Sequence, residues 1–165
     1  MVVAHIFGFC GIIVNALIYQ QNNRQKLLRT KLLSDILWAI HYASIFAWNG
    51  ALTCCISTMR EIVFMNKEKK WAKSKLWLVF FILCAIISAI LTWNGIISIF
   101  PTIASVVSVF MFWIGDPRLT RLCQLPISSG FLLYNVYCMS YMGIVNECFS
   151  LLSIIMVLII KKPST

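Results

Sequence analysis

Long apolar stretches fill almost the whole chain, and short polar or basic segments separate them. Apolar residues make up 61% of the 165 residues, and charged residues only 12%. Soluble domains contain about 45–50% apolar and about 25% charged residues. A globule of this size also leaves more than about a quarter of its chain surface in water. Lipid is therefore the expected solvent, which argues against a soluble enzyme, a nucleic-acid-binding domain and a disordered chain.

The apolar stretches have the length of membrane-spanning helices. A span needs about 20 residues, with a range of about 17–25, so the chain has room for at most about seven. Asn-Gly pairs at 49–50 and 94–95 mark turns between neighbouring stretches. We expect loops at 21–30 and 115–125. The expected spans are Val2–Gln20, Leu32–Trp48, Ala51–Met65, Leu76–Thr92, Ile96–Ile114, Pro126–Met142 and Ile144–Ile160.

The basic residues predict the orientation of these spans. All 14 Lys and Arg residues lie at or after the ends of the first, third, fifth and seventh spans. Cytoplasmic loops are enriched in Lys and Arg, so the N-terminus is expected outside and the C-terminus in the cytoplasm. Joining the second and third spans into one helix would move the six-residue cluster from Arg60 to Lys75 to the outside. The net charge of +9 is thus explained by topology and anionic headgroups rather than by nucleic acid.

The order of the segments repeats within the chain. A helix, a basic segment, a helix, a tight turn and a helix come first, and the same order returns after a lone fourth span. We expect an all-α polytopic membrane protein, with seven transmembrane helices as two parallel three-helix repeats joined by a linker helix. The expected units are 1–66, a basic loop and linker helix at 67–94, and 95–165. At an offset of 93 residues, Trp38 meets Phe131 and His41 meets Tyr134.

Several polar residues fall inside the expected spans, where lipid would not solvate them. Such residues usually face the bundle interior or a wet cavity. His41 and Tyr134 lie near mid-span, Asn135 is beside Tyr134, and Asn146 and Glu147 lie in the outer part of the last span. These residues either line a pocket for a small polar solute or tie helices together by hydrogen bonds. The second explanation is favoured for Asn15, Ser57 and Thr58.

Two further groups of residues have simpler explanations. Asp35 and Arg60 lie near cytoplasmic helix ends, where snorkelling or a local ion pair is enough. Gly8 and Gly11 in the first span permit a close approach of another helix.

The sequence contains no pattern typical of catalysis or of a cofactor site. The seven cysteines form no CxxC pair and no metal-ligand spacing with histidine. His5 and His41 lie at different depths, so they cannot clamp a haem between them. Phosphate loops and hydrolase motifs are missing from the loops. We therefore expect no catalytic residue, metal or cofactor, and a protein that is not an enzyme.

Scattered segments resemble the YgjV-type bacterial inner-membrane proteins. They are Arg24–Leu28, Leu37–Tyr42, Arg60–Val63, Ser98–Ser105, Arg118–Arg121, Leu133–Asn135 and Gly143–Glu147. The resemblance extends over nearly the whole chain and implies a location in the bacterial inner membrane, but no activity. Phe131-Leu132-Leu133-Tyr134 departs from the Trp-x-x-His of the first half, which puts shared histidine chemistry in doubt.

The three-plus-one-plus-three layout resembles the sugar-transporting SWEET and PQ-loop proteins, whose substrate path lies between two triple-helix bundles. By that analogy of fold, His41, Tyr134, Asn135 and Asn146 would line the pocket, and Glu147 would serve as a proton or cation handle.

Two functions remain open from the sequence. The first is a carrier of a small polar solute that works by alternating access between the two bundles. The second is a structural or assembly partner that does not transport, whose polar residues only hold the bundle together. The expected partners are the lipid bilayer and a small polar solute, without nucleic acid. The identity of the solute, any ion coupling and the oligomeric state are left open by the sequence.

Overall fold

The computed structural model describes residues 2–46, 48–91, 93, 95–137 and 141–160, and every regular element within them is a helix. The chain is therefore all-α, as expected. Its elements are α1 (Val2–Ile18), α2 (Arg24–Ser44), α3 (Trp48–Met65), α4 (Leu76–Leu91), a short 3₁₀ helix η1 (Ile96–Ser98), α5 (Ile99–Ile114), α6 (Pro117–Tyr137) and α7 (Tyr141–Ile160).

Two helices begin much earlier than expected. The segments 21–30 and 115–125, predicted as loops, largely form the first turns of α2 and α6. Each helix has an N-cap, because Asn23 Oδ1 accepts the backbone N–H of Gln25 at 2.8 Å and an Asp116 carboxylate oxygen accepts that of Arg118 at 3.1 Å. The loop prediction was wrong because charged first turns have the low hydropathy of loops. Pro126, expected to begin a span, instead lies inside α6.

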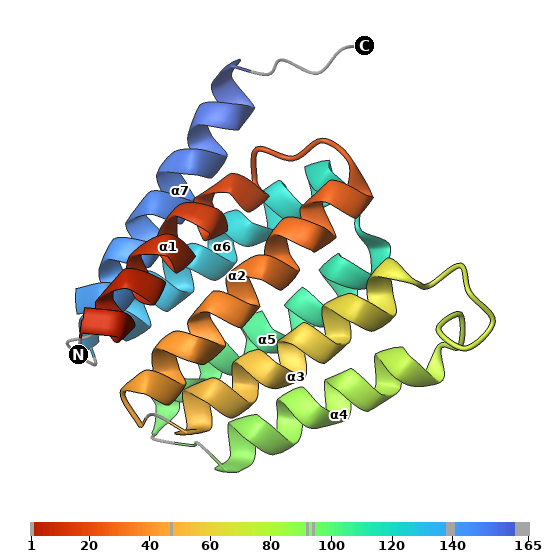
Figure 1. Ribbon diagram of the computed structural model, residues 1–165, viewed down its shortest axis with the longest axis horizontal. Coiled ribbons are helices and arrows are strands. Elements are labelled where there is room, and N and C mark those ends of the chain that lie inside the picture. Colours follow the sequence, from red (N-terminus) through yellow and green to blue (C-terminus); the bar gives the residue numbers. More distant parts are fainter. Residues whose placement is uncertain (1, 47, 92, 94, 138–140, 161–165) are drawn as a thin grey trace.

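Six of the helices form a ring, and α4 packs on its outside. α2 packs between α1 and α3, and α6 packs between α5 and α7 (Figure 1). Contacts of α1 with α7 and of α3 with α5 join the two sets of three. α4 packs mainly against α5. Exchanging the two sets turns the α1–α7 contact into the α5–α3 contact, so the arrangement has an approximate two-fold relation.

The helix starts follow the same relation. α2 and α6 begin 93 residues apart, and so do α3 and α7. The two caps, Asn23 and Asp116, are separated by the same 93 residues. An internal repeat of the backbone explains this spacing, although few side chains are shared between the halves.

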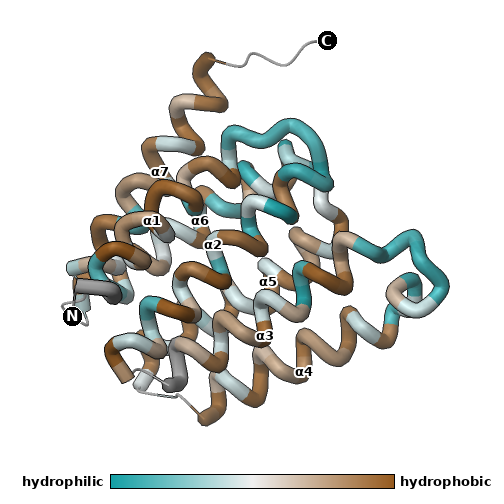
Figure 2. The backbone as a smooth tube through the Cα atoms, viewed as in Figure 1, coloured by the Kyte–Doolittle hydropathy of each residue, from teal (hydrophilic) through white to brown (hydrophobic). Residues whose placement is uncertain are grey.

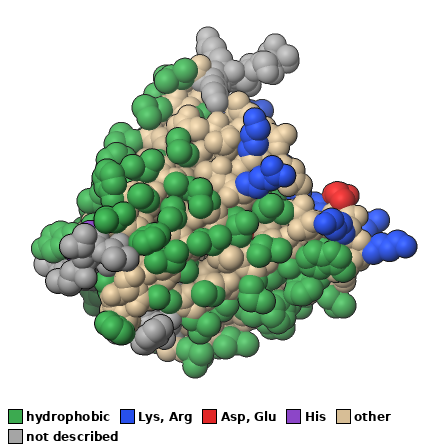
Figure 3. Space-filling view, in the orientation of Figure 1, with side chains coloured by type: hydrophobic (Ala, Val, Ile, Leu, Met, Phe, Trp, Pro, Cys, Tyr) green, Lys and Arg blue, Asp and Glu red, His purple; other side chains and the backbone are tan. Residues whose placement is uncertain are grey.

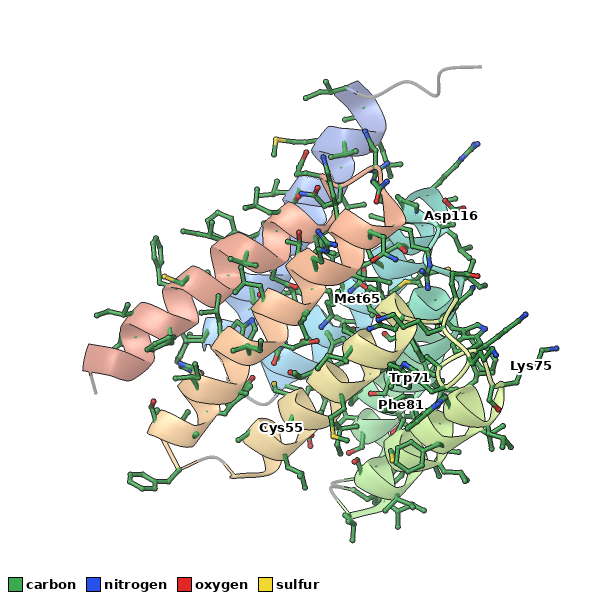
Figure 4. The ribbon with its side chains drawn as sticks, turned by 45° about the vertical axis from the view of Figure 1, so that its right-hand side comes forward. Cys55, Met65, Trp71, Lys75, Phe81 and Asp116 are labelled. Atoms are coloured by element: carbon green, nitrogen blue, oxygen red, sulfur yellow. The ribbon has the colours of Figure 1, made fainter. Side chains whose placement is uncertain are left out.

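The two ends of the bundle differ in charge and in packing. The α1–α2 and α3–α4 connections lie at the same end, where the hydrophilic tube segments and the visible Lys and Arg side chains gather (Figures 2 and 3). Lys75 and Asp116 are exposed at this end (Figure 4). We call it the basic end. The fully buried apolar side chains also concentrate towards it, including Ile18, Leu28 and Phe64, each 0% exposed.

The outer surface of the bundle is apolar. Large side chains such as Phe9, Leu133 and Ile159 are more than half exposed (Figure 3). Two helical segments, Ile96–Ile114 and Tyr141–Ile160, are long and apolar enough to cross a membrane, while α1 and α4 are apolar but shorter. An apolar belt of this extent is typical of a surface in contact with lipid rather than water.

Candidate functional site

A cavity of about 520 Å³ lies between the two sets of three helices, and all seven α-helices contribute to its lining. One wall is a stripe of small hydroxyl side chains, Ser98, Thr102, Ser105 and Ser108, from η1 and α5. Their spacing of three or four residues places them on one helix face. The space is large enough for a small organic molecule, and its walls offer hydrogen bonds.

Four of the five predicted site residues line this cavity. Tyr134 and Asn135 come from the end of α6, and Asn146 and Glu147 from the second turn of α7. The Nδ2 group of Asn146 donates to Glu147 Oε1 at 3.1 Å. Helix geometry brings the two pairs together, because α6 and α7 are antiparallel neighbours joined by a short connection. Their role in solute binding stays a prediction.

The fifth predicted residue, His41, has a different position. It is only 7% exposed and does not line the cavity. Its ring packs edge-on against Trp38, with ring centroids 5.3 Å apart. A Cβ atom added at Gly8 of α1 would lie 2.9 Å from His41 Nδ1, so His41 faces α1. Its neighbours Trp38 and Tyr42, on the adjoining face of α2, do line the cavity.

A polar network connects α1 with α7 at the cavity wall. Asn15 Nδ2 donates to Asn146 Oδ1 at 3.1 Å and lies 3.0 Å from Ser150 Oγ. This contact crosses between the two halves of the chain. Asn15 therefore has the helix-linking role that its sequence position favours, and it also lines the cavity.

Charged residues near the basic end form a cluster that the sequence reasoning missed. Lys31 pairs with Asp35 one turn along α2. On α3, Arg60 donates from Nε and Nη2 to the two carboxylate oxygens of Glu61, at 3.0 and 2.9 Å. Lys31, Asp35 and Arg60 line the cavity, and Glu61 is fully buried behind it. We call these four residues the charged cluster.

The charged cluster also touches the other half of the chain. Phe112 of α5 lies beneath both cations, with Lys31 Nζ at 5.7 Å and Arg60 Cζ at 5.3 Å from its ring centroid. Such cation–π contacts stabilise a buried cation. Of the two alternatives expected for Asp35 and Arg60, snorkelling or a local ion pair, the structure shows the ion pair for both. The Arg60 side chain does not reach out to the surface, because it is only 8% exposed.

The corresponding positions of the second half carry neutral groups. Residues 93 positions after Lys31 and Asp35 are Gln124 and Ser128, and Gln124 Nε2 lies 3.1 Å from Ser128 Oγ. The geometry of the pair is kept while its charge is lost. Conversely, Glu147 of α7 corresponds to Cys54 of α3. The two walls of the cavity thus differ in charge more than in shape.

Two arginines cross-link the helix ends beyond the charged cluster. Arg24 of α2 donates to the carbonyls of Ile114 at 3.3 Å and Phe64 at 2.7 Å, which end α5 and α3. Arg121 of α6 donates to the carbonyl of Tyr19 at 2.7 Å, just after α1. Free carbonyls at helix C-termini need such donors.

The environment of these guanidiniums affects their pKa values. Burial lowers the pKa of Arg24, and the Glu68 carboxylate partly offsets this. Burial likewise lowers the pKa of Arg121, with Asp116 acting in the opposite direction. Arginine nonetheless stays protonated in proteins, so both cross-links keep their positive charge.

In the part of the chain that the structure describes, no three His, Cys, Asp or Glu side chains are grouped as metal ligands would be. The six cysteines described there are free thiols.

A comparison with protein families identifies the chain. The family model of Imp-YgjV, described as a bacterial inner membrane protein, matches residues 2–162. Searches of curated proteins and of solved structures give no match. The match covers nearly the full sequence. The apolar outer surface and the all-helical bundle agree with the family's description as a membrane protein. The chain therefore belongs to the YgjV-type family of bacterial inner membrane proteins.

Proposed function

We propose that this protein is a carrier that moves a small polar solute across the bacterial inner membrane through the cavity between its two three-helix units. The observation that carries the proposal is the cavity itself, which both units line with polar groups within an apolar bundle. A purely structural bundle gains nothing from a solute-sized polar space, because closer packing would be more stable.

In this proposal all seven helices span the membrane, and the basic end faces the cytoplasm. Charges within α2 and α3 lower the hydropathy of these helices. Their Asp35, Arg60 and Glu61 side chains are buried in the bundle, where a membrane protein tolerates charge. The segregation of Lys and Arg to one end supports an outside N-terminus and a cytoplasmic C-terminus (Figure 3).

The structure also fits one state of an alternating-access cycle. The cavity lining reaches Gly143 in the first turn of α7 and Asn135 near the end of α6, at the end opposite the basic one. Towards the basic end, the buried core and the bonds of Arg24 to Ile114 and of Arg121 to Tyr19 hold the two units together. We interpret this as a state open to the outside and closed to the cytoplasm.

The cycle would require the two three-helix units to rock against each other. They meet at the α1–α7 and α3–α5 contacts, which are related by the approximate two-fold axis. Rocking of parallel repeats around a fixed central site is an established way to alternate access. Releasing Arg121 from Tyr19 and Arg24 from Ile114 would open the basic end, because these bonds link the two units.

A thermal-shift screen of the detergent-purified protein against sugars, polyols, amino acids, amines, organic acids and vitamins tests the proposal. A ligand that binds only the folded state adds about 2.7 kcal/mol to the free energy of unfolding at a hundred times its Kd, and this raises Tm. The shift should shrink in Tyr134→Phe, which changes the cavity lining, and persist in Tyr137→Phe, which changes an exposed tyrosine of the same helix.

The competing function is a structural or assembly protein that does not transport. The Asn15–Asn146 bond favours it, because this bond ties α1 to α7 without a solute. Under that function no solute shifts the Tm of the unaltered protein, and the only effect of Asn15→Ala is a lower stability. Under either function we expect no catalysis, and the partners are the lipid bilayer and, for the carrier, the solute.

A further inference from the structure

Glu147 is a buried carboxylate on the wall of the cavity. It is 9% exposed and comes from α7. Its hydrogen-bond partners are the Asn146 amide, at 3.1 Å, and the Ser128 hydroxyl. Both partners are neutral. A buried carboxylate whose charge is met only by neutral donors keeps most of the cost of leaving water.

The other charges of the cavity compensate each other. Lys31 is paired with Asp35 and Arg60 with Glu61. These are the two ion pairs among the described residues, and neither includes Glu147. The four members of the charged cluster sum to zero, so an ionised Glu147 gives the cavity lining and its cluster a net charge of −1. A solute with a positive group would supply the missing charge.

Aromatic rings on both sides of the cavity suit a positive group as well. Trp38 and Tyr42 come from α2, and Phe131 and Tyr134 come from α6. Trp38 and Phe131 are 93 residues apart, so each unit contributes a ring from a corresponding position. The faces of aromatic rings attract ammonium groups, and quaternary ammonium ligands are commonly bound this way.

We propose that the solute carries an organic ammonium group, and that Glu147 pairs with this group while rings of α2 and α6 surround it. This inference rests on the proposed function and narrows it to amines and quaternary ammonium compounds. A neutral polyol would leave Glu147 uncompensated, and an anion would be repelled by it. The hydroxyl stripe of α5 would then bind the polar remainder of the solute.

The test compares charged ligands with neutral ligands of the same shape on the purified full-length protein. Choline is paired with its neutral carbon isostere, dimethylbutanol, and butylamine is paired with butanol. Binding is measured by thermal shift and by isothermal titration. We expect at least one cation of the two pairs to bind at least tenfold more tightly than its neutral partner.

A substitution at Glu147 assigns that preference to this carboxylate. Glu147→Gln keeps the size and an acceptor for Asn146 but removes the charge, so the tenfold preference should disappear. Glu68→Gln removes the same charge from an exposed position between α3 and α4 and should leave the preference intact. If Glu147→Gln does not fold, the comparison of isosteres on the unaltered protein still decides whether a cation is preferred.

Other outcomes separate this inference from the proposed function. Equal binding of a cation and its isostere, or a preference that survives in Glu147→Gln, would overturn the ammonium proposal and leave the carrier intact. Binding of a sugar or an organic acid, with no binding of any of the four probes, would also overturn the ammonium proposal and leave the carrier proposal intact. Absence of binding by the four probes and by the whole solute panel would count against both proposals.

Discussion

Gly143, on the lining of the cavity, shows how single residues shape the site. A Cβ atom there would overlap Oδ1 of Asn135, so a larger residue at this position requires the Asn135 side chain to move. At Gly130, on the same helix as Asn135, a Cβ atom would lie 3.4 Å from Phe100, which is an ordinary contact. The two glycines therefore form a matched pair.

Gly143→Ala should push the Asn135 side chain out of its position and lower stability by about 1–3 kcal/mol, the usual cost of overpacking. Gly130→Ala should be neutral or slightly stabilising, because alanine is the better helix former. Thermal unfolding of both variants in one detergent checks this. Equal effects of the two substitutions would show that α6 and α7 do not pack as described.

Individual site residues were predictable to the extent that depth in the membrane decides their position. Asn146 and Glu147 are polar residues in the outer part of an apolar run, and the structure brings them to the cavity with Tyr134 and Asn135. His41 does not line the cavity but faces α1. Depth in the membrane could not predict this, because it does not determine the direction of a side chain around the helix axis. A local ion pair was one of the two alternatives expected for Arg60, but its partner was not predicted, because Glu61 is the next residue in the chain and this spacing seldom forms a pair within a helix.

Among the elements, α2 and α6 depend most on short-range signals. Their N-caps, Asn23 and Asp116, were present in the sequence. Hydropathy did not reveal these helix starts, because the first turns of both helices are charged. Hydropathy detects contact with lipid, whereas a cap marks where the backbone begins to turn. The positions of the helix starts were therefore predictable in principle, and their repeat at 93 residues would have strengthened the assignment.

The cap of α6 can be tested directly. Asp116→Ala removes the acceptor for the backbone N–H groups of Arg118 and Leu119 and should cost about 1 kcal/mol of stability. Asp116→Asn keeps an oxygen acceptor and should cost clearly less. Chemical or thermal unfolding measures the difference. If both variants lose the same stability, the charge of Asp116 matters rather than its capping bonds.

Arg121 tests the closure of the basic end. Arg121→Lys keeps the charge but cannot bond the carbonyls of Tyr19 and Gln21 in the same fork, at 2.7 and 2.8 Å. We expect a loss of about 1.5–3 kcal/mol, the range for hydrogen bonds to charged groups. Arg118→Lys, on the exposed side of the same turn, should change stability by less than about 0.5 kcal/mol. Similar losses in the two variants would contradict the cross-link.

For the whole molecule, the sequence predicts the order of the helices and the segregation of charge. It could not predict the arginine cross-links at the basic end, because these bonds join residues far apart in the chain. Arg121 and Tyr19 are separated by 102 positions, and no local pattern marks them as partners. The ring of six helices likewise depends on the α1–α7 and α3–α5 contacts, which only the folded chain contains.

The orientation of the molecule gives a further prediction. Truncated fusions to alkaline phosphatase, which is active only outside the cytoplasm, should be active after Gly95, between α4 and α5, and inactive after Lys70, between α3 and α4. The positive-inside rule is the physical reason, because it predicts that the six-residue basic cluster from Arg60 to Lys75 stays in the cytoplasm. The reverse pattern would place the basic end outside and overturn the proposed orientation.

The most direct test of the account is whether the cavity can be reached from outside the cell and not from the cytoplasm. In a cysteine-free background, Thr102→Cys places a thiol on the cavity wall. The control, Ile103→Cys at the next position, places a thiol on the exposed outer surface of α5. A membrane-impermeant thiol reagent should label Thr102→Cys when added to intact spheroplasts and not when added to inside-out vesicles. Ile103→Cys, facing lipid, should react from neither side. Labelling of Thr102→Cys only from the cytoplasmic side, or labelling no stronger than that of Ile103→Cys, would contradict a cavity open to the outside.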